Sequence, residues 1–167
     1  MKTWKVIFAL IVMSVFSVKQ RVQAQDAVKV YYHPEEDAKA EVASAVAEAN
    51  AQHKNVLVMV GGNWCRWCKM FMKFVETTAP VDSALNADFI IAHVNYSKEN
   101  KNLPLLATFG YPQRFGFPVF VVLDGDGHPI HIQNSAYLEQ GEGYSKEKTI
   151  EFFDQWSVEA LDPTKYK

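Results

Sequence analysis

Hydrophobic residues form two kinds of pattern along this chain: continuous apolar runs, and apolar residues at helical spacing. Apolar runs rich in β-branched residues predict buried strands over residues 55–60, 89–96 and 117–123. Apolar residues three and four positions apart predict helices over residues 35–53, 65–78, 81–87, 103–109 and 146–160. Turn residues at 124–127 predict a hairpin that leads into a fourth strand over residues 128–133. A strand followed at once by a helix is half of a βαβ unit, so the pattern predicts one α/β domain.

The first 24 residues have the order of a secretory signal peptide. A basic start precedes thirteen mostly apolar residues at 6–18, and Ala24 ends a plausible cleavage site. A spanning helix needs about 20 apolar residues, so we expect no stable membrane anchor. The alternative is a buried N-terminal helix. We therefore predict an exported protein, periplasmic or otherwise extracytoplasmic. Its parts would be a linker or edge strand at 25–35, a domain at 36–161 and a tail at 162–167.

Composition narrows the class of protein. A chain with 49% hydrophobic and 22% charged residues is typical of a globular domain and excludes collagenous and disordered classes. A net charge of −2 argues against a nucleic-acid partner. Two cysteines are too few for a disulfide-stapled scaffold or a four-cysteine zinc site. We expect neither a metal nor an organic cofactor.

The two cysteines, Cys65 and Cys68, have two residues between them and lie on the first turn of a predicted helix. The free N–H groups and positive dipole end of a helix favour a thiolate at Cys65, which would attack a disulfide while Cys68 resolves the product. A C-x-x-C pair near a βαβ pattern is typical of thioredoxin-like redox motifs. Lys69 stands where c-type haem attachment needs a histidine. An inert disulfide and Cu(I) delivery remain as alternatives.

Two segments resemble the thioredoxin family. Residues 56–69 are similar to the strand and W-C-x-x-C-K active site of thioredoxins, and residues 115–120 are similar to their Gly-apolar-Pro loop. With the export signal, the chain resembles exported thioredoxin-like domains such as the C-terminal domain of the disulfide-interchange protein DsbD. The resemblance implies a thioredoxin fold, with a central mixed β-sheet flanked by helices. It also implies a cis bond between Phe117 and Pro118, with the backbone of Phe117 pairing with a substrate segment as an added strand.

The chain departs from the family pattern at two points. Thioredoxins commonly carry a buried acid six residues before the first cysteine, and this chain has Met59 there, which leaves the proton acceptor for Cys68 open. Arg66 and Trp67 replace the Gly-Pro pair of reducing thioredoxins. The positive charge of Arg66 favours a thiolate at Cys65.

These observations predict an exported thiol–disulfide oxidoreductase. Its partners would be proteins with disulfides or thiols, together with a membrane or soluble redox protein that recycles it. Trp64 and Trp67 flank the first cysteine and would contact substrate, with the alternative that one or both cap the core. The direction of net electron flow stays open. The rival class is a non-catalytic thioredoxin-fold binding module or chaperone that uses Trp64, Trp67 and Phe117.

Overall fold

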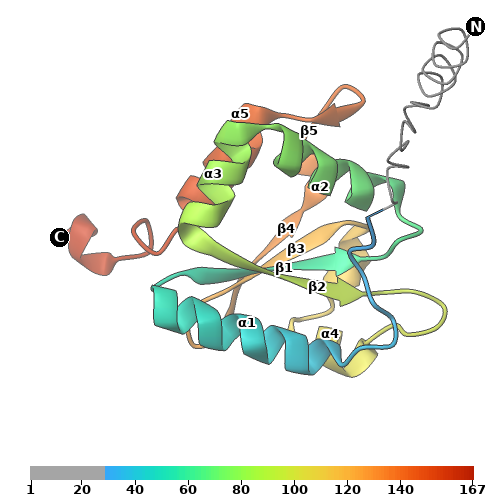
Figure 1. Cartoon of the computed structure of the whole chain (residues 1–167). Coiled ribbons are helices and arrows are strands. Elements are labelled where there is room, and N and C mark those ends of the chain that lie inside the picture. Colours follow the sequence, from blue (N-terminus) through green and yellow to red (C-terminus); the bar gives the residue numbers. More distant parts are fainter. Residues whose placement is uncertain (1–28) are drawn as a thin grey trace, which may run out of the picture.

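The computed structural model describes residues 29–167 (Figure 1). The predicted signal peptide at 1–24 therefore lies outside the described residues. Residues 29–37 contain no strand and lead directly into the first helix. Within the described part of the chain, no helix combines the length and apolar character needed to cross a membrane.

Helices and strands follow one another in nearly the predicted order. They are α1 (Ala38–Gln52), β1 (Asn55–Gly61), α2 (Arg66–Thr77), α3 (Ala79–Asp88), β2 (Phe89–Asn95), α4 (Leu103–Thr108), β3 (Val119–Leu123), β4 (Pro129–Asn134), β5 (Glu139–Gln140), β6 (Gly143–Tyr144) and α5 (Lys146–Gln155). Short 3₁₀ helices occupy Pro112–Phe115, Ser135–Leu138 and Pro163–Tyr166.

The main sheet is mixed and has the order β2-β1-β3-β4. β1 runs parallel to β2 and antiparallel to β3, and β4 is antiparallel to β3. Helices α1 and α4 cover one face, whereas α2, α3 and α5 cover the other (Figure 1). The prediction of a central mixed sheet flanked by helices is confirmed.

All seven residues of β1 are buried, as expected for a central strand covered on both faces. Side chains alternate between the faces of a strand. Val56, Val58 and Val60 pack into the cluster under α1 and α4. Leu57 and Met59 pack into the opposite cluster, which also holds both cysteines. The position that carries an acid in thioredoxins thus lies on the face of the sheet that supports the cysteine pair.

Several predicted ends of elements are wrong for local reasons. α1 begins at Ala38 rather than at residue 35, because the Asp37 carboxylate caps the backbone N–H groups of Lys39 at 2.9 Å and Ala40 at 3.2 Å. α5 ends at Gln155 instead of residue 160, because the chain directly after Gln155 tightens into i→i+3 hydrogen bonds. β3 begins after Pro118, which has no N–H to donate to a strand ladder.

The β5–β6 hairpin is absent from the sequence-based prediction. Its strands have two residues each, too few to show an alternating pattern. The hairpin brings Tyr144 over α2, where its hydroxyl donates to the carbonyl of Trp67 at 3.3 Å. The Tyr144 ring also packs edge-on against Phe71 at 5.0 Å. This short hairpin therefore covers the helix that carries the cysteines.

Candidate active site

Cys65 and Cys68 form a disulfide at the start of α2, with their Cα atoms 5.3 Å apart. Cys65 is the N-cap of α2, and its Sγ accepts the backbone N–H of Cys68 at 3.1 Å. This donor and the positive end of the helix stabilise a thiolate on Cys65 after reduction. Cys65 keeps 4% of its surface exposed and Cys68 none, so an incoming sulfur reaches Cys65 first.

Gly61 leaves the room that the second cysteine needs. A Cβ atom at this position would lie 2.5 Å from Cys68 Sγ and 2.8 Å from the hydroxyl oxygen of Tyr32. Both distances are far below van der Waals contact, so no larger residue fits without displacing the disulfide or the tyrosine. The close approach of sulfur, hydroxyl and backbone depends on a glycine at the end of β1.

Three aromatic side chains gather beside the disulfide. Trp64 is 56% exposed, and its indole N–H donates to the carbonyl of Tyr96 at 2.8 Å. The Phe117 ring lies 5.4 Å from the Trp64 ring and 4.8 Å from the Tyr96 ring. Phe117 also packs against the buried cluster of the two cysteines. The bond between Phe117 and the buried Pro118 is cis, as the family resemblance implies. The structure thus brings together four of the residues predicted for the site (Trp64, Cys65, Phe117, Pro118).

Trp67 and Arg66 lie differently from Trp64. Trp67 is half-buried against the core, with its ring 5.5 Å from that of Tyr144, so it contributes to the packing of α2. Arg66 is exposed on the first turn of α2, where solvent screens its charge. Between residues 29 and 167, the one group of side chains close enough to share a cation is the exposed set His33, Glu35 and Glu36, which includes no cysteine.

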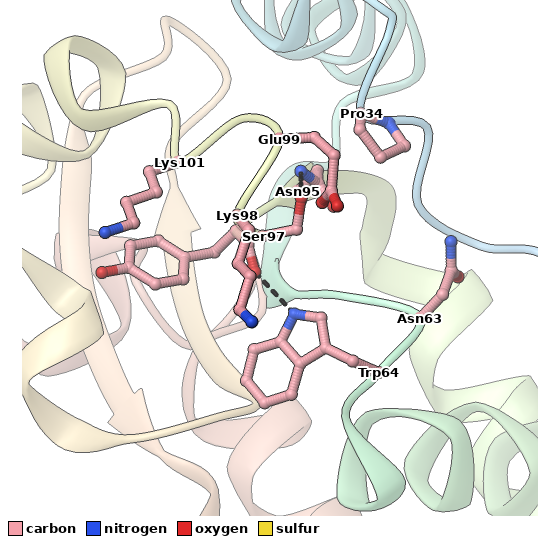
Figure 2. Close-up of a pocket in the computed structure, with 9 residues that line it drawn as sticks. Pro34, Asn63, Trp64, Asn95, Ser97, Lys98, Glu99 and Lys101 are labelled. Atoms are coloured by element: carbon pink, nitrogen blue, oxygen red, sulfur yellow. Dashed lines mark hydrogen bonds between the residues drawn. The ribbon is translucent and has the colours of Figure 1, made fainter.

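A cavity of about 550 Å³ opens beside Trp64 (Figure 2). This is within the size range of ligand pockets, roughly 300–1,000 Å³. Figure 2 shows the indole ring of Trp64 on one side of the cavity and the loop after β2 on the other. Its lining residues come from three segments: Pro34, Asn63, Trp64, Asn95, Tyr96, Ser97, Lys98, Glu99 and Lys101. Sequence reasoning missed this cavity, because no local pattern places the loop after β2 against Trp64.

Two polar side chains near the cysteines, the buried Tyr32 and the half-buried His93, were also missed. Tyr32 is 1% exposed, and His93 lies on β2 directly beside Met59 of β1. The rings of Tyr32 and His93 meet edge-on at 5.3 Å. Burial is the main cause that lowers the pKa of His93 to about 4, and the neighbouring Lys29 and His33 contribute to the same shift. The imidazole is therefore neutral at pH 7.

Comparisons with solved structures agree with this architecture. The disulphide isomerase from Xylella fastidiosa Temecula1 superposes with a TM-score of 0.67 at 25% identity, covering 77% of this chain and 98% of that protein. The DsbD C-terminal domain of Neisseria meningitidis superposes in its oxidised form with a TM-score of 0.50 at 21% identity, covering 72% of this chain and 96% of the domain. Its reduced form gives a TM-score of 0.50 at 24% identity, with 71% and 96% covered. These two likenesses show the fold alone.

No curated protein sequence matches this chain. The sequence model of a thioredoxin-like family does match it, over residues 37–125, more than half of the chain. That segment contains the cysteine pair, the Phe117–Pro118 cis bond and three of the four strands of the main sheet, β1, β2 and β3. The chain therefore belongs to the thioredoxin-like family.

Proposed function

We propose that this protein is an exported thiol–disulfide oxidoreductase that exchanges disulfides with other proteins through Cys65 and Cys68. The geometry at Cys65 carries the proposal: this residue keeps a little exposed surface, caps α2 and accepts a backbone N–H on its sulfur, which is bonded to the fully buried Cys68. The similarity at 25% identity to a protein described as a disulphide isomerase supports the same reaction class.

The reaction proceeds in two exchange steps. The Cys65 thiolate attacks one sulfur of a substrate disulfide, forming a mixed disulfide and releasing the first substrate thiolate, which takes a proton from solvent. The Cys68 thiol then loses its proton, and the resulting thiolate attacks Cys65 Sγ. This forms the Cys65–Cys68 disulfide and releases the second substrate thiol. Two electrons pass to the substrate, and the reverse sequence oxidises a substrate dithiol.

The surroundings of Cys65 suit a polypeptide substrate. We assign the exposed face of Trp64 and the adjoining cavity to an apolar side chain next to the substrate cysteine. We assign the backbone of Phe117 to strand-like pairing with the same segment. Trp67, being half-buried, contributes through the packing of α2 and offers only its outer edge to a substrate.

Recycling requires a second redox protein, in the membrane or in solution, because each turnover leaves the cysteines in the opposite redox state. Neither the reaction nor its recycling calls for a metal, an organic cofactor or a nucleic acid. Export rests on the signal-like pattern of residues 1–24. Mass spectrometry of protein recovered from the exported fraction should find a mature chain beginning at Gln25.

Two cysteine variants test the redox function. The assay is the reduction of a disulfide-linked peptide with a fluorescence readout, in a thiol buffer. Cys65→Ser removes the attacking sulfur and should abolish turnover, whereas Cys68→Ser should stop after the first step and accumulate a peptide–protein disulfide. The proposal would be contradicted if the wild-type protein bound the peptide without ever reducing it and the Cys65→Ser variant bound the peptide equally well. The protein would then be a binding module.

A further inference from the structure

The segment before α1 places a tyrosine hydroxyl next to Cys68. The Tyr32 oxygen and Cys68 Sγ both lie within 3 Å of the point where a Cβ on Gly61 would stand. The two atoms are therefore no farther apart than the sum of those distances, 2.5 and 2.8 Å. Both side chains are completely or almost completely buried, at 1% and 0% exposure. The hydroxyl is therefore shielded from solvent and lies beside the resolving sulfur.

The active-site loop itself holds Tyr32 in place. The Asn63 carboxamide oxygen accepts the backbone N–H groups of Tyr31 and Tyr32, each at 3.3 Å, and its NH₂ group donates to the Tyr32 carbonyl at 2.7 Å. Asn63 stands two residues before Cys65. A second tie lies on α2, where Glu76 accepts from the Tyr31 hydroxyl at 3.1 Å and pairs with Lys29. The position of the Tyr32 ring is thus fixed relative to the cysteines.

The Tyr32 hydroxyl has no hydrogen-bond partner among residues 29–167 in the disulfide-bonded protein. A buried hydroxyl without a partner is destabilising, because it gives up hydrogen bonds to water and gains none. Reduction changes the neighbouring sulfur from a weak acceptor in a disulfide to a thiol or thiolate, and a thiolate is a charged, strong acceptor. Reduction therefore gives the Tyr32 hydroxyl a much stronger acceptor at the neighbouring sulfur than the disulfide offers.

We propose that the Tyr32 hydroxyl donates a hydrogen bond to the Cys68 thiolate and so promotes the resolving step. It would do so in a chain where Met59 replaces the buried acid that thioredoxins commonly carry. The inference rests on the proposed redox function of the cysteine pair. During resolution the Cys68 thiol releases its proton to solvent water, Tyr32 keeps its own proton and donates, and the thiolate attacks Cys65 Sγ. The hydrogen bond stabilises the reduced form over the disulfide, and so makes the couple more oxidising.

The electrostatic surroundings keep the hydroxyl protonated. Burial raises the pKa of Tyr32 above its ordinary value, and the neighbouring Tyr144 acts in the same direction. Neutral His93 contributes no charge at pH 7. Other ionisable groups near Tyr32 and Cys68 come from four elements and from the segment before α1. They are His93 on β2, Tyr144 on β6, Glu41 on α1, Glu76 on α2, and Lys29 and His33 in the segment before α1. Lys29 and Glu76 pair with each other, and Glu41 accepts the backbone N–H of His93 at 2.9 Å.

The test compares Tyr32→Phe with Tyr137→Phe. The first removes one buried oxygen and keeps the ring, while the second makes the same chemical change on a side chain that is 73% exposed. Full-length wild-type and variant proteins are equilibrated in glutathione buffers, and free thiols are counted by alkylation. We expect Tyr32→Phe to lower the equilibrium constant for reduction about tenfold, which corresponds to a potential about 30 mV more negative. Tyr137→Phe should match the wild type.

Two further measurements separate a redox role from a structural one. In a Cys65→Ala background, Tyr32→Phe should raise the pKa of the Cys68 thiol, measured by the pH dependence of its alkylation rate. Thermal unfolding of the Tyr32→Phe protein should show a disulfide form at least as stable as wild type and a relatively weakened reduced form. An unchanged potential with an unchanged Cys68 pKa, or equal losses of stability in both redox forms, would overturn the inference. A wild-type protein that never equilibrates with glutathione would instead refute the proposed function.

Discussion

Replacing Gly61 with alanine tests the packing around Cys68 directly. Alanine is ordinarily favoured over glycine inside a strand, by roughly 0.5–1 kcal/mol, because glycine loses more backbone freedom on folding. At Gly61 the added Cβ would lie 2.5 Å from Cys68 Sγ, 2.8 Å from the Tyr32 oxygen and 3.2 Å from the Tyr32 Cζ. Overpacking of this kind costs about 1–3 kcal/mol. Neither the ring held by Asn63 nor the disulfide on α2 yields freely, so we expect a net loss of about 2 kcal/mol.

The measurement is chemical denaturation of the oxidised protein, with thermal unfolding as a second readout. A loss of about 2 kcal/mol should lower Tm by roughly 4–8 °C in a domain of this size. Gly143→Ala is the matched control, because Gly143 also lies in a strand and an added Cβ there meets no atom within 4 Å. Adding Tyr32→Phe to Gly61→Ala removes one of the two closest contacts and should recover part of the loss. A Gly61→Ala protein as stable as Gly143→Ala would refute the packing described at the end of β1.

Two further predictions concern His93 and Trp64. The folded-state pKa of His93, about 4, lies below the unfolded value of 6.5, so the unfolded chain binds more protons between these pH values. Stability should therefore fall as pH drops from 6.5 to 4, by on the order of 3 kcal/mol from this group. His93→Gln should flatten that slope in urea titrations; a slope equal to that of the wild type would show that the half-buried imidazole is not held neutral in the folded protein. Trp64→Phe keeps an aromatic ring and loses the hydrogen bond to the Tyr96 carbonyl. It should raise KM for the peptide several-fold with little change in kcat, and a fall in kcat alone would contradict a substrate-binding role.

The central elements of the fold were predictable because their signals are local. A continuous β-branched run at 55–60 belongs to a strand buried on both faces, and the structure extends it by only one residue, to Gly61. The ends of the helices depended on details that periodicity does not carry. Glu35 and Glu36 continue the composition of α1, but the carboxylate of Asp37 is the group that caps the helix. The β5–β6 hairpin is too short to leave a pattern of its own.

The residues of the candidate site also differ in whether a local sequence pattern predicts them. Cys65, Cys68 and Pro118 belong to motifs whose spacing is visible in the sequence. Tyr32 and His93 do not, because their place beside the cysteines follows from tertiary contacts. Tyr32 reaches Cys68 only because Asn63 binds the backbone of a segment about thirty residues earlier in the chain. His93 reaches Tyr32 because the parallel register of β1 and β2 sets it beside Met59.

The reduction potential of the Cys65–Cys68 couple in the wild-type protein tests the central claim most directly. Equilibration in glutathione buffers of defined ratio, followed by alkylation and mass analysis, measures the fraction of disulfide at each potential. We predict a reversible two-electron couple between about −270 and −120 mV, the range of thioredoxin-fold oxidoreductases, and the value within it assigns the direction of electron flow. A potential below about −300 mV, typical of structural disulfides, or a pair that never reaches equilibrium would contradict a redox-active site.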